Sequence, residues 1–198
     1  KDEHHEMEVE DAEVVVVLGS VLHEIGMSIH RDDHEFLSLF IARPILQDIL
    51  RGVYKGKEKI IMISEILGAI LPHDRRSTPL TVEAGILSIA DALDMAEGRA
   101  RIPFDAGKVD IHSVSAMSIN NVKIEEGGEG KEPVQVTISM HNSAGIFQVD
   151  ELLKKKVIDS GLDEYFRIVA RIEGEEGEKK ILKEIEYDKL DKDYYEYS

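Results

Sequence analysis

The sequence predicts an α+β protein, in which an all-α helical bundle is followed by a small α+β domain. Up to about residue 106, apolar residues recur mainly at helical spacing. From residue 107 onward, short segments alternate apolar and polar residues with period two, which is typical of strands. We therefore expect a helical domain at residues 1–106, an α+β domain at residues 107–188 and a mobile charged tail at residues 189–198.

The first two helices are predicted from apolar residues that follow acidic ones. Asp11 is suited to the N-cap of the first helix, and Gly26 is suited to its C-terminal cap. Asp32 or Asp33 is suited to cap the second helix, and Pro44 predicts either its end or the start of another helix. The apolar residues of the first helix are Val14, Leu18, Val21, Leu22 and Ile25, and those of the second are Phe36, Leu37, Phe40 and Ile41.

Two more helices are predicted before the change in pattern. Residues 57–71 are rich in isoleucine at helical spacing, and Pro72 is expected to stop this helix. Thr81 is suited to cap a fourth helix at residues 82–96.

The second half predicts four strands and two helices. Strands are expected at residues 121–125, 134–140, 165–172 and 180–185. Helices are expected at residues 112–120 and 148–159, with Gly161 as the cap of the second one. The glycine-rich acidic stretch EEGGEGKEP predicts a hairpin or loop between the first two strands.

Composition excludes several kinds of chemistry. The chain has no cysteine, so disulfides, thiolate catalysis and iron–sulfur clusters are excluded, and any metal must be held by His, Asp and Glu. The formal net charge of -16 repels nucleic acid and anionic lipid, so we expect neither as a partner. No apolar run is long enough to span a bilayer, and we expect a cytoplasmic protein. Exposed strand edges in the α+β domain favour a homo-oligomer.

Several polar residues stand at apolar or helix-end positions. Asp91 lies on the same predicted helix face as Ala84, Leu87 and Met95. A buried carboxylate is normally matched by a cation, whereas at a rim Asp91 would pair with an arginine.

Three histidines stand at similar positions. His23 and Glu24 interrupt an apolar run, while His34 and His73 lie near helix ends. One such histidine is more often a satisfied core residue than a ligand. Together the positions predict an interior polar cluster, and imidazole with carboxylate and no sulfur suits Mn, Fe, Co, Ni or Zn.

These residues resemble a known family. The order of histidine, histidine–acid pair, further histidine and final aspartate on consecutive helices resembles the HD-domain metal-dependent phosphohydrolases. LHEIGMSIH resembles the motif that contains the HD pair, ILPHD resembles a later histidine position, and SIADALDM resembles the helix with the final aspartate. The wider text, including DAEVVVVLG and TVEAGILSIADALDMAEGRARIPF, resembles an archaeal-type subgroup with a C-terminal α+β extension.

The resemblance implies a ligand set and a reaction. The implied metal ligands are His23, Glu24, His73 and Asp91, with His34 as a ligand of a second metal or a contact for the substrate phosphate. They would hold one or two divalent ions, from Mn, Fe, Co, Ni, Zn and Mg. The implied activity is hydrolysis of a phosphoester or phosphoanhydride, with a nucleotide or another small phosphorylated compound as the substrate.

Other residues receive roles in the same reaction. Asp74 is a candidate general base, or a partner that orients His73. Arg31 is a candidate contact for phosphoryl oxygens, or a partner for the neighbouring aspartates. Further candidates for phosphate binding are His30, Arg99 and Arg101, although the two arginines could instead dock the second half of the chain.

The sequence departs from the family pattern in two ways. The family's leading histidine lies on an earlier helix, whereas His4 and His5 are in a polar segment without helical spacing, so we expect that ligand upstream of residue 1. The HD pair reads His23-Glu24, and glutamate is one methylene longer than aspartate. The alternative is therefore a non-catalytic module, derived from an HD domain, that binds a nucleotide or a partner.

Overall fold

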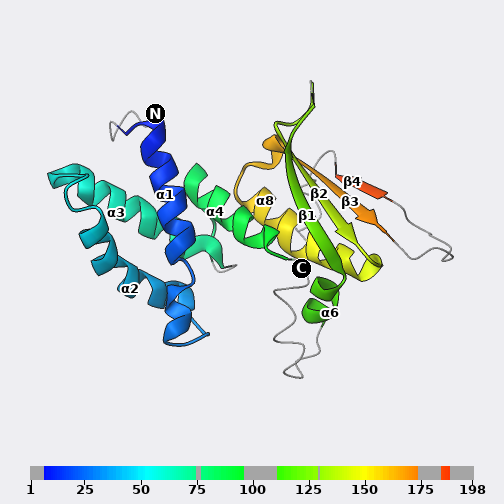
Figure 1. The fold of residues 1–198 in the computed structure, drawn as a ribbon, viewed down its shortest axis with the longest axis horizontal. Helices are drawn as coiled ribbons and strands as arrows, with labels where there is room; N and C mark the ends of the chain where they lie inside the picture. The colour runs from blue at the N-terminus through cyan, green and yellow to red at the C-terminus, as the bar shows by residue number, and fades with distance from the viewer. Residues whose placement is uncertain (1–6, 75–76, 96–110, 129, 174–183, 188–198) are drawn as a thin grey trace. The chain divides into compact units, whose positions relative to one another are not determined.

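The computed structural model describes residues 7–74, 77–95, 111–128, 130–173 and 184–187. The chain divides into two compact units, Lys1–Asp91 and Ala92–Ser198 (Figure 1), and each is described by itself. The first is helical and the second combines helices with a sheet, which confirms the α+β class. The predicted boundary between residues 106 and 107 and the predicted tail at residues 189–198 lie outside the described residues. Among the described helices, none is both long enough and apolar enough to cross a membrane.

The first unit is built from four α-helices around one apolar core. Its elements are α1 (Val9–Leu22), the 3-10 turn η1 (Ile25–Ser28), α2 (His34–Ile49), α3 (Gly56–Ile70), the 3-10 turn η2 (Leu71–His73) and α4 (Val82–Leu93). The core contains Val15 and Leu22 of α1, Leu46 of α2, Ile66 of α3 and Leu87 of α4, each at most 6% exposed. Every helix of this unit therefore contributes to the same core.

Helix α1 begins and ends earlier than predicted. It starts at Val9 rather than after Asp11, and the Asp11 carboxylate accepts a hydrogen bond from the Glu8 amide at 2.8 Å. Asp11 thus satisfies a free amide from inside the first turn, as the acidic partner of a capping box does. The C-cap is His23, not Gly26, because Gly26 lies in η1 after the helix has ended.

Tyr54 ties the loop before α3 to the start of α1. Its hydroxyl donates to the second oxygen of the Asp11 carboxylate at 2.6 Å. Burial and this hydrogen bond raise the pKa of Tyr54 to about 12. The loop and the first turn of α1 are therefore joined through a phenol that stays neutral well above its ordinary pKa.

Replacing Tyr54 by phenylalanine should lower the free energy of unfolding by about 1 kcal/mol at neutral pH. A raised folded-state pKa gives stability that is complete below the ordinary value of about 10 and is lost as the pH rises. The difference between wild type and Tyr54→Phe should therefore shrink as the pH rises through about 12. Urea denaturation along a pH series measures it, with the exposed Tyr165→Phe as the control. Equal losses in the two variants would contradict the prediction.

Helix α2 corrects two predictions. Pro44 neither ends nor starts a helix, because it lies inside α2. The carbonyl that its missing N–H leaves unpaired belongs to Phe40, which is 77% exposed, so water can reach that side of the helix. The apolar residues Phe36 and Phe40 that predicted the helix are not its buried face. The buried residues of α2 are Glu35, Ser38, Ala42 and Leu46. Two polar side chains, Glu35 and Ser38, are therefore buried near the N-terminal end of the helix.

Helices α3 and α4 end and begin as the sequence predicts. Helix α3 stops at Ile70 and passes into η2, in which Pro72 is buried. Thr81 caps α4, because its hydroxyl accepts a hydrogen bond from the Ala84 amide at 3.2 Å. The α4 helix ends at Leu93, before the predicted residue 96, and Asp91 lies in its last turn.

The second unit is a four-stranded mixed sheet with helices. The strands β1 (Ile119–Glu126), β2 (Val134–Met140), β3 (Phe166–Ile172) and β4 (Glu184–Tyr187) lie in that order, with β2 and β3 parallel and the outer pairs antiparallel. The connection from β2 to β3 contains η3 (Ser143–Gly145), α7 (Ile146–Gln148), a π-helical segment η4 (Val149–Lys154), α8 (Lys155–Asp159) and η5 (Asp163–Tyr165). The helix α6 (Ile111–Met117) precedes β1.

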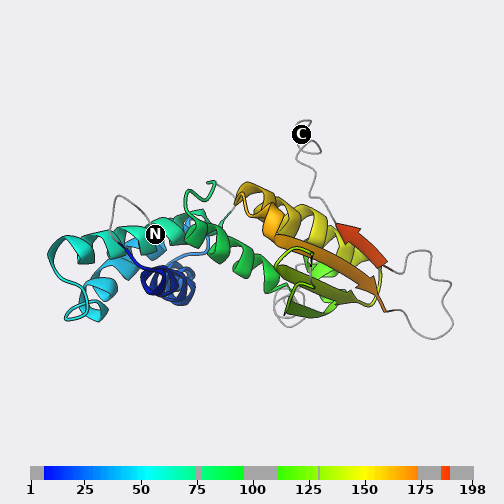
Figure 2. The ribbon, with the colours of Figure 1, turned by 90° about the horizontal axis from the view of Figure 1, so that it is seen from above.

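The helical connection covers one face of this sheet. Figures 1 and 2 both show it lying against the strands. Val149, Leu153 and Val157 of the helix and Val136 and Ile168 of the strands are fully buried. The predicted strands at residues 121–125, 134–140 and 165–172 and the predicted helix at residues 148–159 are therefore confirmed, with ends that differ by a few residues.

Candidate metal centre

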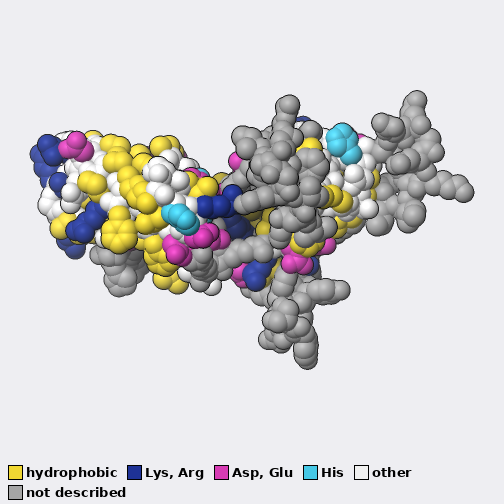
Figure 3. All heavy atoms as spheres, turned by 90° about the horizontal axis from the view of Figure 1, so that it is seen from below, with side chains coloured by type: hydrophobic (Ala, Val, Ile, Leu, Met, Phe, Trp, Pro, Cys, Tyr) yellow, Lys and Arg dark blue, Asp and Glu magenta, His cyan; other side chains and the backbone are white. Residues whose placement is uncertain are grey.

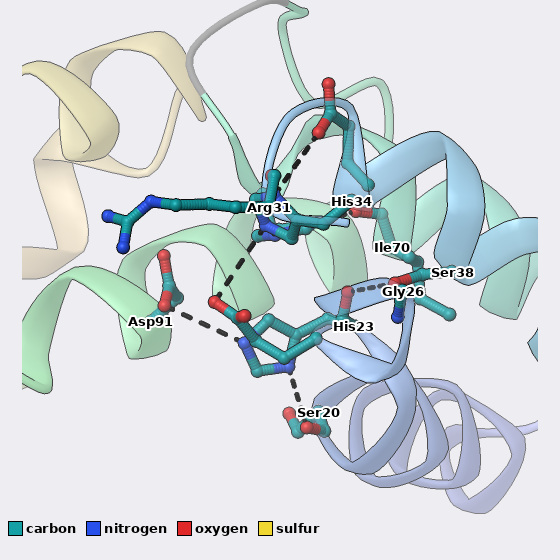
Figure 4. Close-up of polar contacts among 11 residues, drawn as sticks. Ser20, His23, Gly26, Arg31, His34, Ser38, Ile70 and Asp91 are labelled. Carbon is teal, nitrogen blue, oxygen red and sulfur yellow. Dashed lines mark hydrogen bonds and ion pairs between the residues drawn. The ribbon is translucent and has the colours of Figure 1, made fainter. Parts of the chain in front are cut away.

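Five of the residues that the sequence singles out come together in the first unit. Figure 4 shows His23 at the end of α1, His34 at the start of α2 and Asp91 on α4 near one another. Glu24, His34 and His73 each offer one ligand atom within 4.8 Å of the others, and so do His23, Glu24 and Asp91. Glu24 belongs to both groups, so its carboxylate lies where the two groups meet.

Every histidine of the cluster makes the same backbone contact. In each ring Nδ1 lies close to the carbonyl oxygen three residues earlier: Ser20 for His23 at 2.8 Å, Arg31 for His34 at 2.9 Å and Ile70 for His73 at 2.6 Å. A carbonyl oxygen only accepts hydrogen bonds, so Nδ1 must carry the proton in all three rings. In a neutral imidazole of this tautomer Nε2 carries the lone pair, which is the arrangement of a metal-binding histidine.

The Nε2 atoms of His34 and His73 lie 3.0 Å apart. Because both rings use Nδ1 as the donor, two neutral rings would place two lone pairs against each other. A proton or a metal ion between the two nitrogens removes this repulsion. Nitrogens that share one divalent ion at about 2.1 Å each lie about 3.0 to 3.4 Å from each other, for ligand angles between about 90° and 110°. The donor set therefore fits a divalent ion.

The cluster is closed on one side and open on the other. The His73 side chain is 2% exposed, whereas the Glu24 carboxylate is the most exposed of the five at 38%. His23 and Asp91 lie between these values, and their Nε2 and Oδ1 atoms are 3.7 Å apart. Figure 3 shows a histidine side chain beside acidic and basic ones on one face of the helical unit, with hydrophobic side chains around them.

The histidines differ in their affinity for a proton. Burial lowers the pKa of His73 below its ordinary value, and the neighbouring His23 and His34 rings add to the effect against the Ile70 carbonyl. Burial also acts to lower the pKa of His23, but the nearby Asp91 carboxylate and the Ser20 carbonyl outweigh it and raise that pKa. Burial therefore favours the neutral, metal-binding form of His73, whereas at His23 a proton competes more strongly with a metal ion.

The other candidate residues lie around or outside the cluster. Asp74 directly follows His73 and is partly buried, but it belongs to neither ligand group. His30 and Arg31 are exposed in the loop before α2, where the His30 ring accepts a hydrogen bond from the Asp32 amide at 3.0 Å and the Arg31 carbonyl accepts one from His34. Arg99 and Arg101 lie outside the described residues.

Two buried residues next to the cluster were not singled out from the sequence. Glu35 is 1% exposed, and its carboxylate lies 3.6 Å from Nδ1 of His34. Ser38 is fully buried one turn further along α2. The available signal was their position, since Glu35 and Ser38 continue the stripe of Ala42 and Leu46 at helical spacing.

Residues 2–96 match the protein family described as HD domain. The helical part of this chain is an HD domain. A protein from the archaeon Methanocaldococcus jannaschii, with the printed name Uncharacterized protein MJ1020, is 43% identical over 176 residues. The match covers 89% of this chain and 66% of that relative, so the chain spans slightly less than two thirds of the relative's length. No solved structure matches the chain. The HD domain contains all five candidate ligands, and the α+β unit lies beyond it in the sequence.

Proposed function

We propose that this HD domain is a metal-dependent phosphohydrolase that cleaves a phosphoester or phosphoanhydride in a nucleotide or another small phosphorylated compound. The observation that carries the proposal is the pair of ligand groups that share Glu24. The same groups contain three imidazoles, each with Nδ1 facing a backbone carbonyl and Nε2 facing the cluster, and two carboxylates. This set supplies the neutral nitrogens and anionic oxygens that divalent transition ions prefer.

Different residues of the HD domain would have different roles in such a reaction. His23, Glu24, His34, His73 and Asp91 would hold one or two divalent ions. When bound, such an ion supplies charge neutralisation for the phosphate and lowers the pKa of water to about 7. Arg31 is exposed in the loop before α2, where its guanidinium would be accessible to the phosphoryl oxygens of a substrate. Asp74 is better suited to orient His73 than to accept a proton from water, because it belongs to neither ligand group.

The proposal is tested with full-length protein purified without a tag or chelator. Elemental analysis should find divalent metal, and inorganic phosphate should be released from part of a panel of nucleotides and phosphoesters in Mn²⁺ or Co²⁺. Replacing Asp91 by asparagine should reduce phosphate release by more than about a hundredfold, because loss of a ligand should cost more than loss of a residue that supports one. Asp48→Asn is the matched control, because Asp48 is an exposed carboxylate that pairs with the exposed Arg51 at the surface.

Two outcomes would reject the proposal in different ways. A wild-type protein that takes up no Mn²⁺ or Co²⁺ has no functional metal centre. A wild-type protein that binds metal but releases no phosphate from any compound of the panel supports the alternative, a non-catalytic module that binds a nucleotide or a partner. Thermal stabilisation by nucleotides then identifies the bound class.

A further inference from the structure

Ser38 connects the two parts of the HD domain that contribute most of the candidate ligands. Its hydroxyl donates to the His23 carbonyl at 2.6 Å and accepts a hydrogen bond from the Gly26 amide at 2.9 Å. Figure 4 shows the Ser38 side chain pointing toward His23 and Gly26. The hydroxyl thus bridges the two ends of the short segment that carries Glu24.

Both backbone groups need this partner. The His23 carbonyl belongs to the C-cap of α1, where the helix leaves its last carbonyls without intrahelical partners. The Gly26 amide lies in a buried residue at the start of η1. A buried backbone group without a partner is costly, and a single hydroxyl satisfies both. The segment from His23 to Gly26 is therefore fixed to α2 at two points, on either side of Glu24.

Ser38 is also tied to the ligand group that contains His34. It follows His34 by one helical turn, so the two side chains lie on neighbouring positions of the same face of α2. The Ser38 hydroxyl holds the segment of His23 and Glu24, and the α2 backbone holds His34. The Glu24 Oε1 atom lies 3.9 Å from the His34 Nε2 atom. This separation depends on how closely the segment lies against α2.

We propose that Ser38 is a positioning residue of the metal centre, which sets the separation of His23 and Glu24 from His34 through backbone atoms. The inference rests on the proposed metal centre but is independent of any particular substrate. Ser38 itself is not a ligand, because its hydroxyl is engaged by a carbonyl and an amide. Alanine at this position would leave both backbone groups unpaired, and cysteine would retain only a weak donor.

The test compares Ser38→Ala with Ser115→Ala in full-length protein, with Co²⁺ as the probe. Ser115 is the matched control, because it is also fully buried and its hydroxyl accepts a hydrogen bond from Gln148 at 2.7 Å in the other unit. We expect Ser38→Ala to bind Co²⁺ about 10- to 100-fold more weakly, with an altered visible absorption spectrum of the bound ion. Ser115→Ala should lose thermal stability but keep the affinity and the spectrum of the wild type.

Each result separates this inference from the proposed function. Unchanged Co²⁺ affinity and spectrum in Ser38→Ala, in a wild type that binds Co²⁺, would overturn the role of Ser38 and leave the hydrolase proposal intact. If the wild type binds Co²⁺ but releases no phosphate, the hydrolase proposal fails, and weaker Co²⁺ binding by Ser38→Ala still supports the role of Ser38. Absence of Co²⁺ binding in the wild type overturns both. If Ser38→Ala does not fold, Ser38→Cys decides: several-fold weaker binding supports the role, and wild-type affinity overturns it.

Discussion

Replacing Glu24 by glutamine is expected to abolish metal binding and phosphate release together. Glu24 is the one residue that both ligand groups share, so the variant weakens both at once. Glutamine keeps the size and shape of the side chain but removes the negative charge. We expect Co²⁺ affinity to fall by well over a hundredfold, more than the loss of a supporting residue costs. Calorimetric titration with Co²⁺ and a phosphate-release assay measure the two effects.

A matched control in the preceding helix isolates the effect of the site. Glu13 is an exposed glutamate in α1, and Glu13→Gln removes the same charge from the same part of the chain. This variant should bind Co²⁺ as the wild type does, since a surface charge so far from the cluster is screened by salt. Equal affinity losses in Glu24→Gln and Glu13→Gln would mean that net charge, rather than coordination, controls Co²⁺ binding.

Glu24→Asp addresses the departure from the family pattern. The Glu24 carboxylate reaches both ligand groups with its longer side chain. Aspartate would withdraw the carboxylate by one methylene, so we expect weaker Co²⁺ binding and no gain in phosphate release. A rise in either quantity would indicate that glutamate impairs the centre. The non-catalytic alternative would then become the better account of this HD domain.

The sequence predicted the elements better than the faces they bury. In α2, apolar spacing located the helix from Phe36 and Phe40, but both side chains are largely exposed. The core packs instead against a stripe that starts with Glu35 and Ser38. Residue type alone points away from that stripe, because charged and hydroxyl side chains are seldom fully buried. A buried face that contains them depends on partners from distant parts of the chain, which periodicity does not reveal.

Most of the candidate ligands, unlike the buried faces, could be identified from the sequence. His23, His34, His73 and Asp91 were identified by residue type, position and family resemblance, and the structure brings them together across four helices. Their tautomers could not be predicted, because each depends on a carbonyl that the local backbone presents to Nδ1. The role inferred for Ser38 was equally hidden, since its two contacts are with backbone atoms of other segments.

Gly26 is the residue at which the smallest substitution should damage the fold of the HD domain most. Its φ angle is not in the left-handed region, so the reason for glycine is close approach rather than backbone conformation. A Cβ atom at this position would lie 2.1 Å from the His34 carbonyl oxygen and 2.6 Å from the Ser38 amide nitrogen. Both are backbone atoms of α2, so no side chain can rotate away to make room.

Gly26→Ala should therefore lower the free energy of unfolding by about 3 kcal/mol, the upper part of the range for overpacking a tight core. Because η1 and α2 must move apart, His34 moves away from Glu24 and Co²⁺ affinity falls as well. Gly68→Ala is the matched control in α3, where a Cβ meets nothing within 4 Å. That change should stabilise the domain by about 0.5–1 kcal/mol, since alanine favours the helix. Urea denaturation should thus show that one added methyl group changes the free energy of unfolding with opposite sign in the two variants. A small loss of this free energy in Gly26→Ala would refute the close approach of Gly26 to the α2 backbone.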